Sequence, residues 1–129
     1  MPEDQVTRVA TILIIEDESH LRRDICELLG FSGYETLEAG NGAAGLQKAI
    51  QHVPDMILCD ITMPGMDGLQ VLEQVRANPL TAHIPFVFLT ARAEEDLRDV
   101  LKRAGANDYL SKPFTLDQLH EVIEANISS

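Results

Sequence analysis

Residues 10–29 read ATILIIEDESHLRRDICELL, a strand pattern, an acidic turn and a helix pattern in direct succession. The run Ala10–Ile15 is apolar almost throughout, as in a strand that is covered on both faces. From Leu21 to Leu29 the apolar residues follow the i, i+4, i+7, i+8 spacing of a helix with one buried face, and Ser19 is its expected N-cap. A buried strand that leads straight into such a helix favours a parallel sheet with helices packed on it.

The same alternation of strand and helix patterns continues through the rest of the chain. Tyr34–Glu38 alternates between apolar and polar residues, which predicts a strand at the edge of the sheet. Three further strands are expected over Met56–Cys59, Phe86–Leu89 and Asp108–Leu110. Four further helices are expected. The first covers 42–52, and the second begins at Asp67 and ends at Asn78-Pro79. The third covers 94–104 and ends before Gly105, and the fourth begins at the capping-box pattern of Thr115 and Gln118.

This order of elements predicts an α/β fold of three layers, in which a doubly wound, parallel, five-stranded sheet carries helices on both faces. With 129 residues the chain is long enough for one domain and too short for two of ordinary size. We expect a single domain over 1–129, with its core at about 10–127 and an N-terminal extension at 1–9.

The composition excludes several classes of function. Ten Lys and Arg residues against 21 Asp and Glu residues give a formal net charge of −11, and without a basic run this argues against direct binding of nucleic acid. The apolar runs are far shorter than the roughly 18 residues of a membrane-spanning helix, and Met1–Ala10 shows no secretory signal pattern. We therefore expect a cytoplasmic protein that does not enter a membrane.

The residues of metal and redox chemistry are scattered. Cys26 and Cys59 lie inside apolar patterns and not in a CxxC pair, so we expect them to be reduced core residues. The four histidines show no metal-ligand spacing (His20, His52, His83 and His120).

Acidic residues follow two of the expected strands, at the sheet edge where open α/β proteins bind ligands. Glu16 and Asp17 follow the first strand, and Asp60 follows the third. If these strands are neighbours, three carboxylates converge, which their mutual repulsion disfavours unless a cation is bound. A hard divalent ion such as Mg²⁺, with oxygen ligands, is the simplest solution. Alone, Glu16 and Asp17 could instead be an acidic helix start.

Thr90 and Lys112 follow the fourth and fifth strands. A carboxylate can attack a phosphoryl group to give an acyl phosphate, and such a transfer is catalysed mainly by positioning and by a metal and a lysine that neutralise the phosphoryl oxygens. A hydroxyl such as that of Thr90 can donate to a remaining oxygen, although threonine is also a common helix cap. The pattern as a whole predicts phosphoryl transfer onto a carboxylate.

Four motifs resemble those of the receiver domains of two-component response regulators, the CheY-like family. The motifs are IIED at Ile14–Asp17, CDITMPGMDG at Cys59–Gly68, FLTA at Phe88–Ala91 and YLSKPF at Tyr109–Phe114. They occur in the family's order, and the resemblance extends from about Ala10 to Ile127. It implies the flavodoxin-like strand order 2-1-3-4-5.

The resemblance also implies which residues form the reactive site. Asp60 is the expected phosphoacceptor. The expected Mg²⁺ ligands are Asp17, Asp60 and the backbone carbonyl of Thr62, with Glu16 acting on the metal through water. Glu16 stands where the family more commonly has Asp.

Further roles follow from the same resemblance. Lys112 and Thr90 are expected to assist the transfer, and the Lys112–Pro113 peptide bond is expected to be cis. Thr90 and Tyr109 are the expected switch residues, although a half-buried tyrosine in a strand also serves packing. Arg92, like Thr62, stands where family members modulate how long the phosphoryl group lasts.

By this resemblance the chain is a phosphorelay switch and not an enzyme with a separate substrate. Its expected partners are a histidine kinase or histidine phosphotransfer protein, and a downstream target or an output domain absent from this sequence. The signalling surface would comprise helix 94–104, strand Asp108–Leu110 and the helix after Thr115, through which a homodimer could also form. A stand-alone protein and part of a longer regulator or hybrid kinase both fit.

Three other functions compete with this interpretation. A receiver-like interaction scaffold that never takes phosphate would not need every chemical position to be filled. An aspartate-nucleophile phosphatase of the haloacid dehalogenase type needs a second acid two residues after its nucleophile, where Thr62 stands, and usually a cap domain. A flavodoxin-like electron carrier has a phosphate loop rich in Ser, Thr and Gly after the first strand, where Glu16–Glu18 would repel a phosphate.

Overall fold

The side chains of the central strands alternate between two hydrophobic cores, one on each face of the sheet.

A computed structural model describes residues 9–91 and 97–127. The strands are β1 (Thr11–Ile15), β2 (Glu35–Ala39), β3 (Met56–Asp60), β4 (Phe86–Thr90) and β5 (Asp108–Ser111). The helices are α1 (Ser19–Phe31), α2 (Gly42–His52), α3 (Gly68–Ala77), α4 (Leu97–Ala104) and α5 (Leu116–Asn126).

The five strands form one parallel sheet in the order β2-β1-β3-β4-β5, which confirms the predicted fold. The half-buried strand β2 lies at an edge, as its alternating sequence predicts. The chain winds outward in both directions from the boundary between β1 and β3, where Ile15 pairs with Cys59. The residues that follow these two strands therefore lie side by side at the topological switch point.

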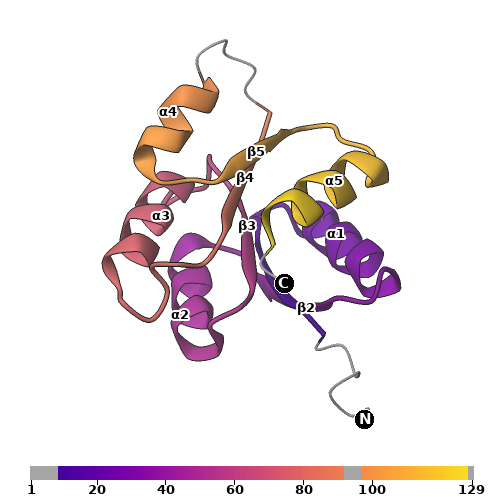
Figure 1. Cartoon of the computed structure of the whole chain (residues 1–129), viewed down its shortest axis with the longest axis horizontal. Helices are drawn as coiled ribbons and strands as arrows, with labels where there is room; N and C mark the ends of the chain where they lie inside the picture. The colour runs from indigo at the N-terminus through magenta and orange to yellow at the C-terminus, as the bar shows by residue number, and fades with distance from the viewer. Residues whose placement is uncertain (1–8, 92–96, 128–129) are drawn as a thin grey trace.

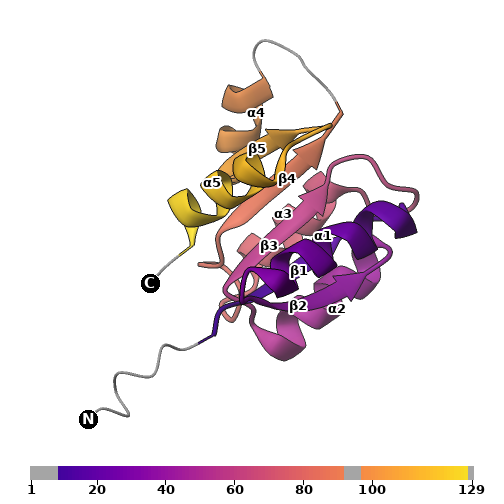
Figure 2. The ribbon, with the colours of Figure 1, turned by 90° about the vertical axis from the view of Figure 1, so that its right-hand side faces the viewer.

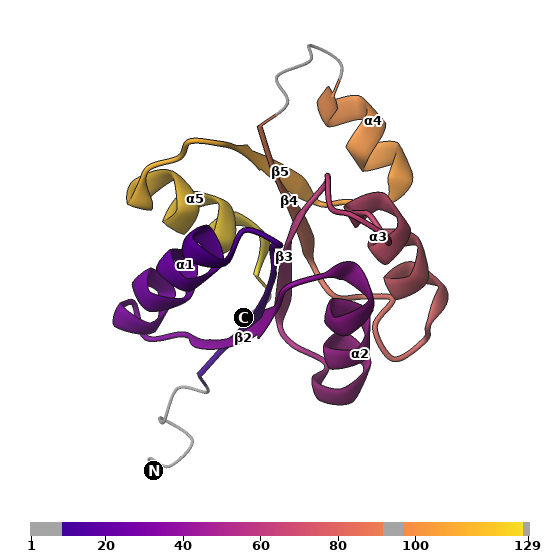
Figure 3. The ribbon, with the colours of Figure 1, turned by 180° about the vertical axis from the view of Figure 1, so that it is seen from behind.

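The helices divide between the two faces of the sheet, α1 and α5 on one and α2, α3 and α4 on the other (Figure 1). The view from behind shows the same three layers, and the side view places α1 and α5 in front of the sheet (Figure 3 and Figure 2). Ile12, Ile14 and Leu58 face α1 and α5, whereas Leu13 and Ile57 face the other three helices. Successive residues of one strand thus enter opposite cores, which explains why these strands are apolar throughout.

Local signals account for most helix ends. The predicted start of α3 at Asp67 is confirmed, where Asp67 forms a capping box with Gln70, and so is the predicted capping box of α5 (Thr115 with Gln118). The predicted stop after α4 is confirmed as well, because Gly105 has φ +108°.

The prediction of Ser19 as the N-cap of α1 is wrong. The helix begins at Ser19 and Glu18 caps it, its carboxylate accepting from the amides of His20 at 3.1 Å and Leu21 at 2.7 Å. Both hydrogen bonds lower the pKa of the Glu18 carboxyl, and the one from the Leu21 amide has the larger effect. A glutamate is long enough to fold back over the first turn, so the acidic turn itself supplies the cap.

Some expectations fall outside the described residues. These are the start of the fourth helix at 94, the position of Arg92 and nearly all of the extension at 1–9. Within 9–91 and 97–127, no helix combines the length and apolar character needed to span a lipid bilayer.

Candidate functional site

Three carboxylates meet where β1 and β3 end. One oxygen from each of Glu16, Asp17 and Asp60 lies within 4.8 Å of the others, as neighbouring strands require. Asp17 is exposed, whereas Glu16 retains 1% and Asp60 8% of its accessible surface. Burial raises the pKa of Glu16, and the charge of Asp60 adds to this, while bonds from Lys112 and the Glu18 amide oppose it. Such a cluster has oxygen donors suited to a hard divalent cation.

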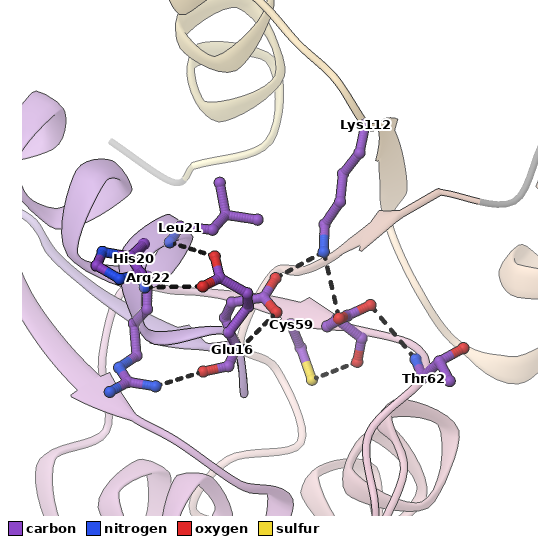
Figure 4. Close-up of polar contacts among 9 residues, drawn as sticks. Glu16, His20, Leu21, Arg22, Cys59, Thr62 and Lys112 are labelled. Carbon is purple, nitrogen blue, oxygen red and sulfur yellow. Dashed lines mark hydrogen bonds and ion pairs between the residues drawn. The ribbon is translucent and has the colours of Figure 1, made fainter.

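Lys112 reaches into the acidic cluster from the end of β5. Its Nζ lies 2.7 Å from Glu16 Oε1 and 3.2 Å from Asp60 Oδ2 (Figure 4). Burial by itself would lower the pKa of Lys112, but the hydrogen bond to Glu16 and the two carboxylate charges raise it on balance. The lysine is therefore held as a cation against both buried acids. The Lys112–Pro113 peptide bond is cis, the form that the resemblance implies.

The loop after β3 holds the other side of the Asp60 carboxylate. The Thr62 amide donates to Asp60 Oδ1 at 3.3 Å, so the two carboxylate oxygens have different protein donors. The backbone carbonyl of Asp60 in turn accepts a hydrogen bond from the Cys59 thiol at 3.2 Å (Figure 4). The Asp60 side chain is thereby oriented before any ligand binds.

The remaining predicted residues lie on β4 and β5. Thr90 is the last residue of β4 and is buried, and its backbone carbonyl accepts from the Lys112 amide at 2.7 Å. Tyr109 pairs with Phe88 across these strands and is half-buried, with the Arg98 guanidinium of α4 5.5 Å from its ring centre. Thr90 and Tyr109 thus lie on neighbouring strands, Thr90 at the end that carries the acidic cluster and Tyr109 next to α4.

The two cysteines are buried free thiols, as predicted, and burial raises the pKa of each. A raised pKa keeps them protonated, which argues against a nucleophilic role.

Gly68, the last residue of the motif that begins at Cys59, has a packing role that the sequence alone does not reveal. A Cβ at residue 68 would lie 2.2 Å from the carbonyl oxygen of Asp60, and the Gly68 amide donates to Ile61 at 2.8 Å. Only a residue without a side chain lets α3 start this close to the strand that carries Asp60. The sequence signal is a lone glycine after a capping aspartate, which by itself is weak.

The model of the response regulator receiver domain family matches residues 12–124. The chain belongs to this family. Among curated relatives, the phosphate regulon transcriptional regulatory protein PhoB of Pseudomonas aeruginosa is 38% identical over 84% of this chain and 48% of its own length. The transcriptional regulatory protein PdtaR of Mycobacterium tuberculosis is 37% identical over 91% of the chain and 56% of its own length. The receiver domain thus spans about half the length of these two relatives.

Solved structures agree with this assignment. The chemotaxis protein CheY4 of Vibrio cholerae superposes with a TM-score of 0.88 at 28% identity, covering 93% of this chain and all of that one. The receiver domain of sensor histidine kinase PA1611 from Pseudomonas aeruginosa has a TM-score of 0.85 at 30% identity and covers 95% of this chain. That structure has a magnesium ion coordinated in its active-site cleft. Family membership favours two-component signalling over the phosphatase and electron-carrier interpretations.

Proposed function

We propose that this receiver domain accepts a phosphoryl group on Asp60 from a phosphohistidine of a histidine kinase or histidine phosphotransfer protein. The observation that supports this most directly is the environment of the Asp60 carboxylate. Its oxygens contact the Thr62 amide at 3.3 Å and Lys112 Nζ at 3.2 Å, and two further acids lie within reach of one metal ion. A carboxylate oriented in this way can act as the attacking group.

The donor set fits Mg²⁺, which binds a few carboxylates together with water and phosphate oxygens. We assign Asp17, Asp60 and the Thr62 backbone carbonyl as direct ligands, with Glu16 acting through water. When bound, Mg²⁺ would offset the negative charge that the carboxylates and the phosphoryl group bring together.

The chemical step moves the phosphoryl group from nitrogen to oxygen. An Asp60 oxygen forms a bond to phosphorus, the bond from phosphorus to the histidine nitrogen breaks, and its electron pair returns to the imidazole. Lys112 neutralises a phosphoryl oxygen, and the Thr90 hydroxyl donates to another. A hollow of about 440 Å³ beside the site provides room for the phosphodonor, lined by Leu21, Ala91, Lys112, Pro113 and Phe114.

The output surface in this proposal is formed by α4, β5 and α5. Movement of Thr90 toward the phosphoryl group would free space for Tyr109 to turn inward, which alters the contact between Tyr109 and Arg98 of α4. A two-state surface of this kind can regulate a downstream target or an output domain, or favour a homodimer. We place this cycle in the cytoplasm.

Intact-mass measurement after incubation with acetyl phosphate tests the proposal. We expect one phosphoryl adduct that requires Mg²⁺, is removed by hydroxylamine and is absent in Asp60→Asn. An adduct of the same size in Asp60→Asn would contradict the assignment. A folded wild-type protein that binds Mg²⁺ but accepts no phosphoryl group from any donor would favour the interaction scaffold.

A further inference from the structure

Arg22 reaches from the start of α1 to the turn that carries the acidic residues. Its Nη1 donates to the backbone carbonyl of Glu16 at 2.7 Å, and its Nε pairs with the Glu38 carboxylate of β2 at 3.2 Å. The Arg22 side chain is 20% exposed and that of Glu38 is 43% exposed, so the guanidinium is mostly covered whereas the ion pair is partly open to water. Figure 4 shows Arg22 and Lys112 approaching Glu16 from different sides, one toward its main chain and one toward its carboxylate.

The carbonyl that Arg22 holds belongs to the peptide group between Glu16 and Asp17. Because a peptide group is planar, fixing its carbonyl also fixes the direction in which the chain enters Asp17. The Glu16 amide donates to Ala39 at 3.1 Å, so both backbone polar groups of Glu16 are held. The Asp17 carboxylate is exposed, and within the described part of the chain no hydrogen bond or ion pair fixes it. The location of the Asp17 carboxylate therefore depends on the backbone of Asp17.

Gly40, directly after β2, leaves room for this arrangement. A Cβ at residue 40 would lie 3.1 Å from Nη1 and 3.6 Å from Cζ of Arg22. A methyl group there would push the guanidinium by a few tenths of an ångström and so strain its hydrogen bond to the Glu16 carbonyl. Three features thus serve one contact: the arginine, the Glu38 carboxylate that anchors it and a glycine that makes space for it.

We infer that Arg22 is a positioning residue for the magnesium site, acting through the Glu16–Asp17 peptide group. This inference rests on the proposed binding of Mg²⁺. The sign of the change in Mg²⁺ affinity distinguishes this role from a simple charge effect, because a nearby positive charge by itself opposes the binding of a second cation. Removal of that charge alone would strengthen Mg²⁺ binding, whereas loss of the held peptide group would weaken it.

Calorimetric titration of the metal-free protein with MgCl₂ distinguishes the two effects. We expect Arg22→Met to weaken Mg²⁺ binding by about tenfold, the lower end for loss of a residue that supports a metal ligand. The matched control is Arg23→Met, which removes the same charge from an exposed neighbour on α1. Binding by this control should be unchanged or slightly tighter.

Two further variants keep the test decisive if Arg22→Met folds poorly. Gly40→Ala retains the charge but displaces the guanidinium, so it should weaken binding in the same direction. Arg22→Lys should recover part of the affinity. In metal-free NMR spectra the Asp17 amide resonance should shift in Arg22→Met and Gly40→Ala and stay in place in Arg23→Met.

The outcomes separate the two proposals. Mg²⁺ binding by folded Arg22→Met and Gly40→Ala that is as tight as in the wild type, or tighter, would overturn the role of Arg22. A wild-type protein that binds no Mg²⁺ would overturn the proposed function itself.

Discussion

Substitution of Gly68 by alanine tests whether the start of α3 is packed against the strand that carries Asp60 as tightly as the structure shows. The added Cβ would lie 2.2 Å from the Asp60 carbonyl oxygen, 2.9 Å from the Ile61 Cα and 2.9 Å from a ring carbon of Phe88. Two of these three atoms belong to the backbone and cannot rotate away. Overpacking costs about 1–3 kcal/mol, and this immobile environment places Gly68→Ala at the upper end, at about 3 kcal/mol.

Gly30→Ala is the matched control. Gly30 also lies in a helix, α1, but a Cβ there would have no neighbour within 4 Å. Alanine restricts the unfolded chain and favours the helix, so this variant should be more stable than the wild type by about 0.5 kcal/mol.

Urea unfolding followed by far-UV circular dichroism measures both effects as changes in the free energy of unfolding. A free energy of unfolding for Gly68→Ala within about 1 kcal/mol of the wild type, the lower end of the overpacking range, would contradict this close packing. So would a loss of stability in Gly30→Ala as large as that in Gly68→Ala, because the loss would then reflect any alanine and not the close approach.

Three further predictions concern a helix cap, a half-buried arginine and the metal. Thr115→Ala removes the oxygen that accepts from the Gln118 amide at 3.1 Å and should lower the free energy of unfolding by about 1 kcal/mol in urea, whereas an unchanged midpoint would contradict the capping box. Arg76→Met removes four hydrogen bonds that tie α3 to the segments before β4 and β5. We expect the free energy of unfolding to fall by about 3 kcal/mol and amide exchange around Asn107 to become faster. Unaltered exchange around Asn107 would count against these contacts. Mg²⁺ at ten times its dissociation constant should stabilise the wild type by about 1.4 kcal/mol in thermal or urea unfolding, reversibly with EDTA. Asp17→Asn should lose most of this stabilisation, and an equal gain in that variant would exclude Asp17 as a ligand.

Features that depend on neighbouring residues in the chain could be predicted from the sequence. The capping boxes at Asp67 and Thr115 and the stop at Gly105 each rest on residues at most three apart. The edge location of β2 followed from its alternation, because a strand with one exposed face needs polar residues at every second position. The misassigned cap at Ser19 shows the limit of such rules, since the flanking Glu18 offered a competing acceptor.

Features that depend on contacts between distant segments could not be predicted in this way. The order of the strands came from the family resemblance, because no local pattern states which strand pairs with which. The sequence placed Glu16 and Asp17 together but did not indicate that Glu16 is buried against Lys112 while Asp17 is exposed. Gly68 approaches the backbone carbonyl of Asp60, and Arg22 donates to that of Glu16. Because every residue has a backbone carbonyl, no sequence pattern indicates such contacts.

In the proposed function Asp60, and neither of the two acids beside it, forms the acyl phosphate. The most direct measurement is to phosphorylate the protein with acetyl phosphate and Mg²⁺, reduce it with borohydride and locate the modified residue by tandem mass spectrometry. Reduction converts a phosphorylated aspartate to homoserine, and we predict this change at position 60 alone. Reduction at position 16 or 17, or an intact aspartate at position 60 in protein that carries the phosphoryl group, would contradict it.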